Sequence, residues 1–172
     1  MRLEELAAKV RTLEDIEGIR KLQFRYTYFL DTSQWDDVVN LFAENAKAQI
    51  SDLPLCEGKE EIAKVFKQLF GSGMATMTRH MVIQPVVEVE GDRAKGTFYL
   101  FACATFKLPQ GPTAAWSQGK YENEYVREKG EWKISSLKIK MTFRTPYADG
   151  WVKTPMMDMG AEWRRWQEQK DT

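Results

Sequence analysis

Apolar residues at the start of the chain recur every three or four positions, the spacing of one helix face. This pattern predicts helices over 3–13, 13–30, 34–42 and 59–70 and leaves a short strand over 46–53. Thr12 and Asp15 have the spacing of a capping signal, so we expect a new helix to begin there. The second helix is expected to end at Asp31-Thr32-Ser33, where Ser33 can cap the next one.

After Met77 apolar and polar residues alternate, which is the pattern of half-buried strands. The alternation predicts strands over 80–89, 94–108, 114–127 and 132–144, with turns at 90–92, 109–112 and 128–131. Pro85 lies inside the first of these strands and indicates a sheet edge or a bulge. The tail over 154–172 is expected to hold a short helix.

The order of these elements predicts an α+β fold. Helices come first and a meander of long strands follows, so the helices should pack on one face of a curved, mostly antiparallel sheet. Such a sheet around a long helix forms a cone-shaped α+β barrel, whose interior is a default site for an apolar ligand. We divide the chain into a helical extension over 1–12, a cone domain over 13–147 and a tail with a short helix over 148–172.

Composition narrows the classes of function. The 172 residues include 25 acidic and 25 basic side chains, without the basic face of a nucleic-acid binder. No apolar run approaches the roughly 18 residues of a membrane span, and the acidic first residues do not resemble a signal peptide. Cys56 and Cys103 match no metal-ligand spacing and suit free thiols in a reducing cytosol. We therefore expect a cytoplasmic protein without a nucleic-acid partner, membrane association, metal or cofactor.

The chain contains a single histidine, His80. Proton transfer near neutral pH therefore depends on this imidazole or on a carboxylate with a shifted pKa. Aromatic residues make up 12% of the chain, enough to wall an apolar cavity. The ordinary alternative is that His80 is a half-buried structural residue between Arg79 and Met81.

Several segments resemble the SnoaL-like family of the nuclear transport factor 2-like superfamily. Residues 15–20 (DIEGIR), 26–31 and Trp35 resemble the opening helix of that family, and 119–134 (GKYENEYVREKGEWKI) resembles its closing hairpin. The resemblance implies the cone fold. It implies no single activity, because the superfamily holds lyases, isomerases, cyclases and proteins that only bind.

Two enzymes of the superfamily, bile-acid 7α-dehydratase and hexachlorocyclohexane dehydrochlorinase, have patterns similar to this chain. Both pair a histidine at the start of a strand with an aspartate near the end of the first long helix, which corresponds here to His80 and Asp31. Tyr26 matches a tyrosine of the bile-acid enzyme. A further aspartate and an arginine of that enzyme fall on Ala102 and Met141, so the resemblance implies a less polar site here.

The resemblance thus implies His80 as a catalytic base, Asp31 as the carboxylate that orients it and Tyr26 as an assisting hydroxyl. An elimination needs a base for a proton on carbon and help for the leaving group. A neutral imidazole held by a carboxylate is suited to that work. Asp31 could instead only end its helix, and Tyr26 could be a core residue.

Strand alternation selects residues for the lining of the cavity. Met141 and Phe143 should share one face of the last strand, together with Leu137 and Ile139. The substrate-binding residues expected are Ala102, Met141 and Phe143, with Val82 and Trp116 as further lining. Plain sheet packing explains each of these positions as well.

The leading hypothesis is a cofactor-independent lyase of the dehydratase type, or an isomerase, acting on a small cyclic or polycyclic apolar molecule. The alternative is a non-catalytic module of the same fold for ligand binding or assembly. The small subunit of a ring-hydroxylating dioxygenase is a third reading. We also expect a homo-oligomer, a trimer or a dimer, because a free sheet face commonly packs against a copy of itself.

Overall fold

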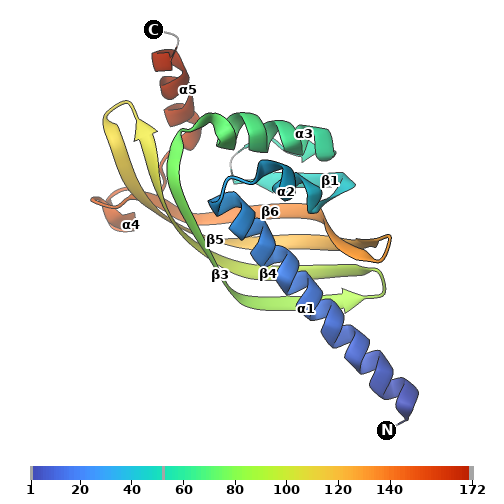
Figure 1. Cartoon of the computed structure of the whole chain (residues 1–172). Helices are drawn as coiled ribbons and strands as arrows, with labels where there is room; N and C mark the ends of the chain where they lie inside the picture. The colour runs from blue at the N-terminus through green and yellow to red at the C-terminus, as the bar shows by residue number, and fades with distance from the viewer. Residues whose placement is uncertain (1, 52, 171–172) are drawn as a thin grey trace.

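The computed structural model describes residues 2–51 and 53–170. A long helix, α1 (Leu3–Asp31), crosses one face of a curved sheet, and its N-terminal half projects beyond the sheet (Figure 1). We call the face that carries α1 the inner face. The other helical segments are α2 (Trp35–Asn40), α3 (Lys59–Lys64), a π-helical turn (Val65–Leu69), a 3₁₀ turn (Phe70–Ser72), α4 (Gly150–Lys153) and α5 (Met159–Lys170).

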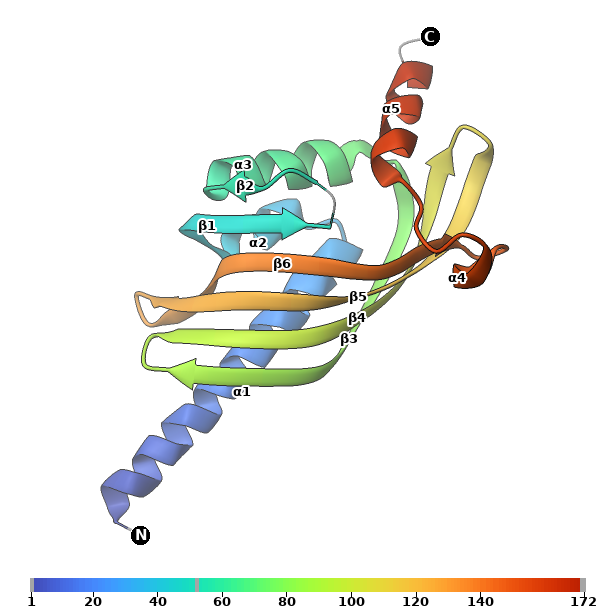
Figure 2. The same cartoon turned by 180° about the vertical axis from the view of Figure 1, so that it is seen from behind.

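The sheet has six strands in the order β2-β1-β6-β5-β4-β3 (Figure 2). The strands are β1 (Phe42–Ile50), β2 (Cys56–Glu57), β3 (Ala75–Glu90), β4 (Arg93–Leu108), β5 (Gly111–Glu128) and β6 (Glu131–Pro146). β1 runs parallel to β6 and every other pair is antiparallel. The predicted α+β cone is confirmed, although the sheet stays open, with edges at β2 and β3.

The core lies between α1 and the inner face of the sheet. Ile19, Leu22 and Tyr26 of α1 are buried there, because they fall at three- and four-residue spacing on one side of the helix. The largest fully buried side chains that meet them are Phe42, Phe66, Phe98, Tyr121, Tyr125, Ile134 and Leu137. Each such burial stabilises the fold by roughly 1.5–3 kcal/mol.

Polar contacts fix the direction of α1 across the sheet. The Asp15 carboxylate accepts hydrogen bonds from Arg127 and from Trp132 Nε1. Burial alone would raise the pKa of Asp15, but these two donors outweigh it and hold the pKa below its usual range. Further along α1, Asn123 donates to the buried Gln23 Oε1 at 2.8 Å. The helix is thereby held at two points before it reaches Asp31.

The predicted break near residue 12 does not occur. α1 is continuous from Leu3 to Asp31. The Thr12 hydroxyl donates to the Ala8 carbonyl one turn earlier. It therefore bonds within the continuous helix and does not cap a new one. The predicted end of the helix at Asp31 is confirmed. The extension over 1–12 and the tail over 148–172 include positions 1, 171 and 172, which lie outside the described residues.

Strand starts also differ from the prediction. β1 begins at Phe42 and not at 46, and β3 begins at Ala75, so His80 lies within β3 and not at its start. The proline argument is confirmed, because β3 is an edge strand and its register shifts between Ile83 and Val86, around Pro85. Among the described residues, none of the helices is both long and apolar enough to span a membrane.

Candidate functional site

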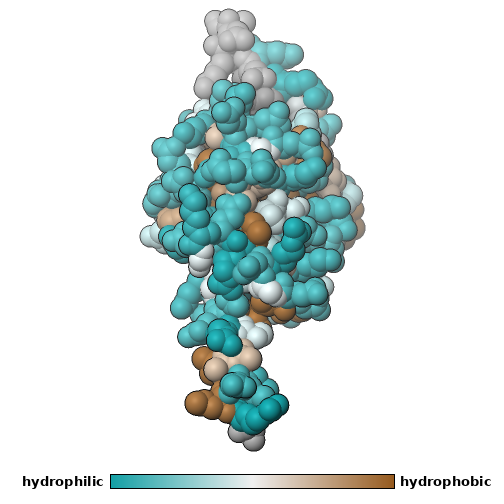
Figure 3. All heavy atoms as spheres, turned by 90° about the vertical axis from the view of Figure 1, so that its right-hand side faces the viewer, coloured by the Kyte–Doolittle hydropathy of each residue, from teal (hydrophilic) through white to brown (hydrophobic). Residues whose placement is uncertain are grey.

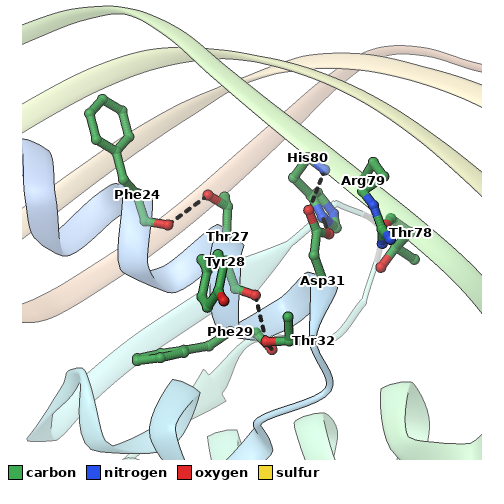
Figure 4. A network of polar contacts seen from close by, with 9 residues as sticks. All are labelled: Phe24, Thr27, Tyr28, Phe29, Asp31, Thr32, Thr78, Arg79 and His80. Carbon is green, nitrogen blue, oxygen red and sulfur yellow. Dashed lines mark hydrogen bonds and ion pairs between the residues drawn. The ribbon is translucent and has the colours of Figure 1, made fainter.

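Asp31, at the end of α1, and His80, in β3, face each other (Figure 4). Asp31 Oδ1 lies 2.6 Å from His80 Nδ1, and Asp31 Oδ2 accepts the backbone N–H of His80 at 2.9 Å. The side chains are 15% and 20% exposed. An ionised carboxylate against Nδ1 favours the tautomer with its proton on Nδ1, which leaves Nε2 with a free lone pair.

Local structure explains why the two side chains meet. β3 is the sheet edge, so part of its backbone has no strand beside it, and Asp31 supplies an acceptor to the His80 N–H there. α1 stops at Asp31 because Ser33 adopts a positive φ of 56°, and the N–H groups of Ser33 and Gln34 turn back to Leu30 O and Phe29 O. A carboxylate at a helix C-terminus is disfavoured by about 0.3–1 kcal/mol. The positive charge of a protonated His80 would relieve that disadvantage.

Strand register defines which residues share the inner face with His80. Directly opposed residues lie on the same face of a sheet. His80 is opposed by Ala102, Ala102 by Ser117 and Ser117 by Arg144, which forms one row across four strands. We call these four residues the His80 row. Arg144 was not among the predicted site residues.

The neighbouring row contains two more of the predicted lining residues. Val82 is opposed by Leu100, Leu100 by Gly119 and Gly119 by Met141. A Cβ on Gly119 would lie 2.5 Å from the Lys140 carbonyl oxygen, so only glycine fits where β5 and β6 approach here. Val82, Ala102 and Met141 therefore all lie on the inner face.

The predicted faces of Phe143 and Trp116 are wrong. The register of β6 shifts between its pairs with Gln118 and Gly119, so one extra residue separates Met141 from Phe143 in the ladder. Phe143 consequently turns to the outer face, where its ring centroid lies 5.0 Å from that of Trp151. Trp116 alternates with Ser117 and also lies on the outer face. The same bulge brings Arg144 to the inner face. Simple alternation along the strand could not have predicted this position.

Tyr26, which was predicted as an assisting hydroxyl, lies in the aromatic core. Its side chain is 1% exposed and its ring meets Phe42, Phe66 and Tyr121 edge-on. Burial, and then Tyr121, raises the pKa of Tyr26 well above its usual value. Within the described residues, no hydrogen bond joins Tyr26 to Asp31, and none to the His80 ring.

Tyr121 is a second buried hydroxyl that the sequence analysis did not select. Burial raises its pKa, and the charge of nearby Asp31 raises it further. Tyr121 is opposed by Phe98 and alternates with Gly119 on the inner face of β5. The alternation pattern of β5 could therefore have indicated it.

Two apolar clusters lie on the inner face on either side of the His80 row. The main core lies on one side. On the other, Met74, Leu108 and Ala115 pack with Met157 of the C-terminal tail. The tail is held at the sheet by Arg144, whose N–H donates to Pro155 O and whose carbonyl accepts from the Met157 N–H. His80, Ser117 and Arg144 between these clusters are only partly buried.

A separate recess of about 340 Å³ opens beside α2. It is lined by Ser33, Gln34, Trp35, Asp36, Asp37 and Lys67. This is a polar surface recess and not the apolar cavity predicted around His80. Across residues 2–51 and 53–170, no three His, Cys, Asp or Glu side chains gather in a way that could hold a metal ion.

Comparisons with known proteins identify a family and several similar structures. A family model described as a SnoaL-like domain matches residues 11–138. A hexachlorocyclohexane dehydrochlorinase of type 2 is 22% identical, with a TM-score of 0.74 over 80% of this chain and 92% of its own. The type 3 enzyme from Novosphingobium barchaimii is 20% identical, with a TM-score of 0.72 over 81% and 94%.

A protein from Novosphingobium aromaticivorans, provisionally called a scytalone dehydratase, is 20% identical, with a TM-score of 0.71 over 79% of this chain and 89% of its own. At such identities these likenesses establish a shared fold and no more. Among curated proteins, none matches this chain.

Proposed function

The chain belongs to the SnoaL-like family, as its resemblance predicted, and from that premise we propose that it is a cofactor-independent lyase or isomerase. Its substrate would be a small cyclic or polycyclic apolar molecule. The observation that carries the proposal is the 2.6 Å contact between Asp31 Oδ1 and His80 Nδ1. It provides the arrangement in which a lone imidazole works as a general base.

In the proposed elimination, His80 Nε2 removes a proton from a carbon of the substrate. The electron pair of that C–H bond forms a carbon–carbon double bond, and the leaving group on the adjacent carbon departs with its own bonding pair. Asp31 stabilises the imidazolium that results. In an isomerase the same proton would return to the substrate at another carbon, so both reactions begin with one step.

The leaving group needs a proton or a positive charge. We propose Tyr26 as the assisting hydroxyl, with Tyr121 and Arg144 as further candidates. The raised pKa values of both tyrosines keep each phenol protonated and able to donate. Tyr121 is supported by its proximity to Asp31. Arg144 is supported by its place in the His80 row, three strand spacings of about 4.8 Å from His80.

The substrate class rests on the composition of the inner face. Ala102 opposes the histidine, Val82 and Met141 lie in the neighbouring row of the inner face, and the apolar cluster with Met157 lies on the other side of the His80 row. The similar structures carry names that refer to cyclic or polycyclic compounds, hexachlorocyclohexane and scytalone. A compact ring molecule with one departing hydroxyl or halide fits both observations.

The alternative function is a non-catalytic ligand-binding or assembly module. One observation favours it: Tyr26 is packed into the aromatic core, as a structural residue would be.

We also propose that the protein forms a homo-oligomer in the cytoplasm. Its support is the apolar outer face of the β3 edge, where Met81, Ile83 and Tyr99 are 47%, 50% and 45% exposed, and the two free cysteines, which suit a reducing compartment.

The proposed function is tested with scytalone, γ-hexachlorocyclohexane and a set of cyclic β-hydroxy ketones in D₂O, followed by mass spectrometry and titration calorimetry. Loss of water or HCl, or uptake of deuterium on carbon, that disappears in His80→Asn and in Asp31→Asn supports the proposal. Binding of a compound that stays unchanged through prolonged incubation supports the binding module. If none of the compounds is bound and none is converted, the proposed substrate class is contradicted.

A further inference from the structure

The N-terminal half of α1 carries an apolar stripe that no other part of the described chain covers. Leu3, Leu6, Val10 and Leu13 are 82%, 43%, 45% and 65% exposed. Figure 1 shows this part of the helix beyond the sheet, and Figure 3 shows apolar surface at that end of the molecule. Side chains of this kind are normally packed, so a repeated exposed row indicates an interaction surface.

The stripe has the spacing of a coiled coil. Its four members follow steps of three, four and three residues, the a and d positions of two heptads with Leu3 at a. A β-branched residue at a with leucine at d favours two parallel strands, and Val10 at a lies between Leu6 and Leu13 at d. The seam ends where Glu17 takes the next a position.

The charges beside the stripe select the partner. Position g of the first heptad is Lys9, and position e of the second is Glu14. In a parallel pair of identical helices, Lys9 of each copy faces Glu14 of the other, on both sides of the seam. In an antiparallel pair with the same apolar layers, Lys9 would face Lys9. The charge pattern is therefore complementary to a second copy in parallel orientation.

The seam also points away from the rest of the molecule. At about 100° per residue, its centre lies on nearly the opposite side of α1 from Ile19, which is fully buried against the sheet. Residues 2–14 are exposed apart from Ala7, which is partly buried. A second helix can approach this side without meeting the sheet of its own chain.

We propose that the N-terminal half of α1 forms a short parallel two-stranded coiled coil with a second copy of this chain. Two heptads make a weaker contact than the three or four of an independent coiled coil, so the pairing is reversible. It is separate from the outer face of the sheet and from the site at His80.

Disulfide trapping of the full-length chain tests this proposal. A Val10→Cys substitution brings the two copies of position 10 to the Cα separation of 4.4–6.8 Å that a disulfide requires, because a faces a in a parallel pair. Arg11→Cys, at the outward b position, is the matched control and keeps the same two native cysteines. After mild oxidation, the peptide linked through position 10 is measured by mass spectrometry.

The expected yield for Val10→Cys is roughly fivefold or more above that for Arg11→Cys. In the Val10→Cys background, Lys9→Glu or Glu14→Lys alone lowers the yield several-fold, and the two together restore it. Positions 9 and 14 do not face each other within one helix, so this recovery is specific to the second copy. Equal yields at positions 10 and 11, or no recovery in the double variant, overturn the proposal.

Discussion

The Asp31 carboxylate holds His80 at two points, since Oδ1 meets the imidazole Nδ1 at 2.6 Å and Oδ2 accepts the backbone N–H at 2.9 Å. One side chain thereby fixes both the ring and the strand that carries it. This double contact joins the end of α1 to the edge of the sheet. It gives Asp31 a structural role in addition to the proposed chemical one.

Loss of Asp31 should therefore lower stability as well as activity. Asp31→Ala leaves a partly buried N–H without an acceptor and is expected to reduce the free energy of unfolding by about 1–3 kcal/mol. Asp31→Asn retains an acceptor oxygen and should cost under about 1 kcal/mol. Urea denaturation measures both. Asp36→Ala, which removes an 83% exposed carboxylate paired with Lys67, is the control and should change little. Equal effects of the three variants would contradict the double contact.

Tyr26 offers a way to separate packing from chemistry. Its ring meets three other rings in the core, so Tyr26→Ala should destabilise the fold by about 3–5 kcal/mol, whereas Tyr26→Phe keeps the ring and should cost under about 1 kcal/mol. Thermal unfolding provides the comparison. If the hydroxyl assists the leaving group, Tyr26→Phe loses conversion while it stays folded. Full conversion in that variant would assign the assisting role elsewhere, with Tyr121→Phe as the next variant to measure.

The tail packs Met157 into the apolar cluster at the sheet, with the partly buried Met159 against it. Met157 is 9% exposed and packs with Met74 and Leu108, whereas its neighbour Met156 is 48% exposed. Met157→Ala is expected to cost about 2 kcal/mol or more, and Met156→Ala under about 0.5 kcal/mol. Chemical denaturation of the two variants tests the difference. A similar loss from both would mean that the tail does not pack as described.

The sequence predicted the helix-then-meander order, the edge position of the strand with Pro85 and the end of α1 at Asp31. Periodicity could not reveal the bulge of β6, because an extra residue changes the face of Phe143 without changing the character of the strand. For the same reason Arg144 was overlooked. The predicted helix start at Thr12 was wrong because a threonine hydroxyl can bond a carbonyl within a helix as readily as it caps one. The pairing of His80 with Asp31 came from a family resemblance, since spacing alone does not bring positions so far apart together.

Glu122 makes a pH-dependent contribution to stability. Hydrogen bonds from Lys120 and Lys140 lower the pKa of Glu122 to about 2 from its ordinary 4.5. Because the folded pKa is the lower one, the contribution is complete above about pH 4.5 and is lost as the pH falls towards 2. The difference in unfolding free energy between the wild type and Glu122→Gln should therefore be constant near neutral pH and shrink across that window.

A series of urea denaturation curves from neutral pH downward measures that difference for Glu122→Gln. Glu124→Gln is the control, because it removes a carboxylate from the same strand but not the contacts of Glu122 with Lys120 and Lys140. Added salt should reduce the Glu122 effect, since the contacts are partly exposed. A difference that stays unchanged down to about pH 2 would contradict the ion-pair origin of the shift.

The proposed function requires Asp31 to hold the lone histidine as a neutral base with Nε2 free. Because His80 is the single histidine, ¹⁵N-histidine labelling gives an NMR spectrum of one imidazole without assignment. The contact with Asp31 predicts the Nδ1–H tautomer in the neutral ring, with a hydrogen-bonded Nδ1 proton that is lost from the spectrum in Asp31→Ala. An Nε2–H tautomer in the wild type, or a spectrum that Asp31→Ala leaves unchanged, would contradict it.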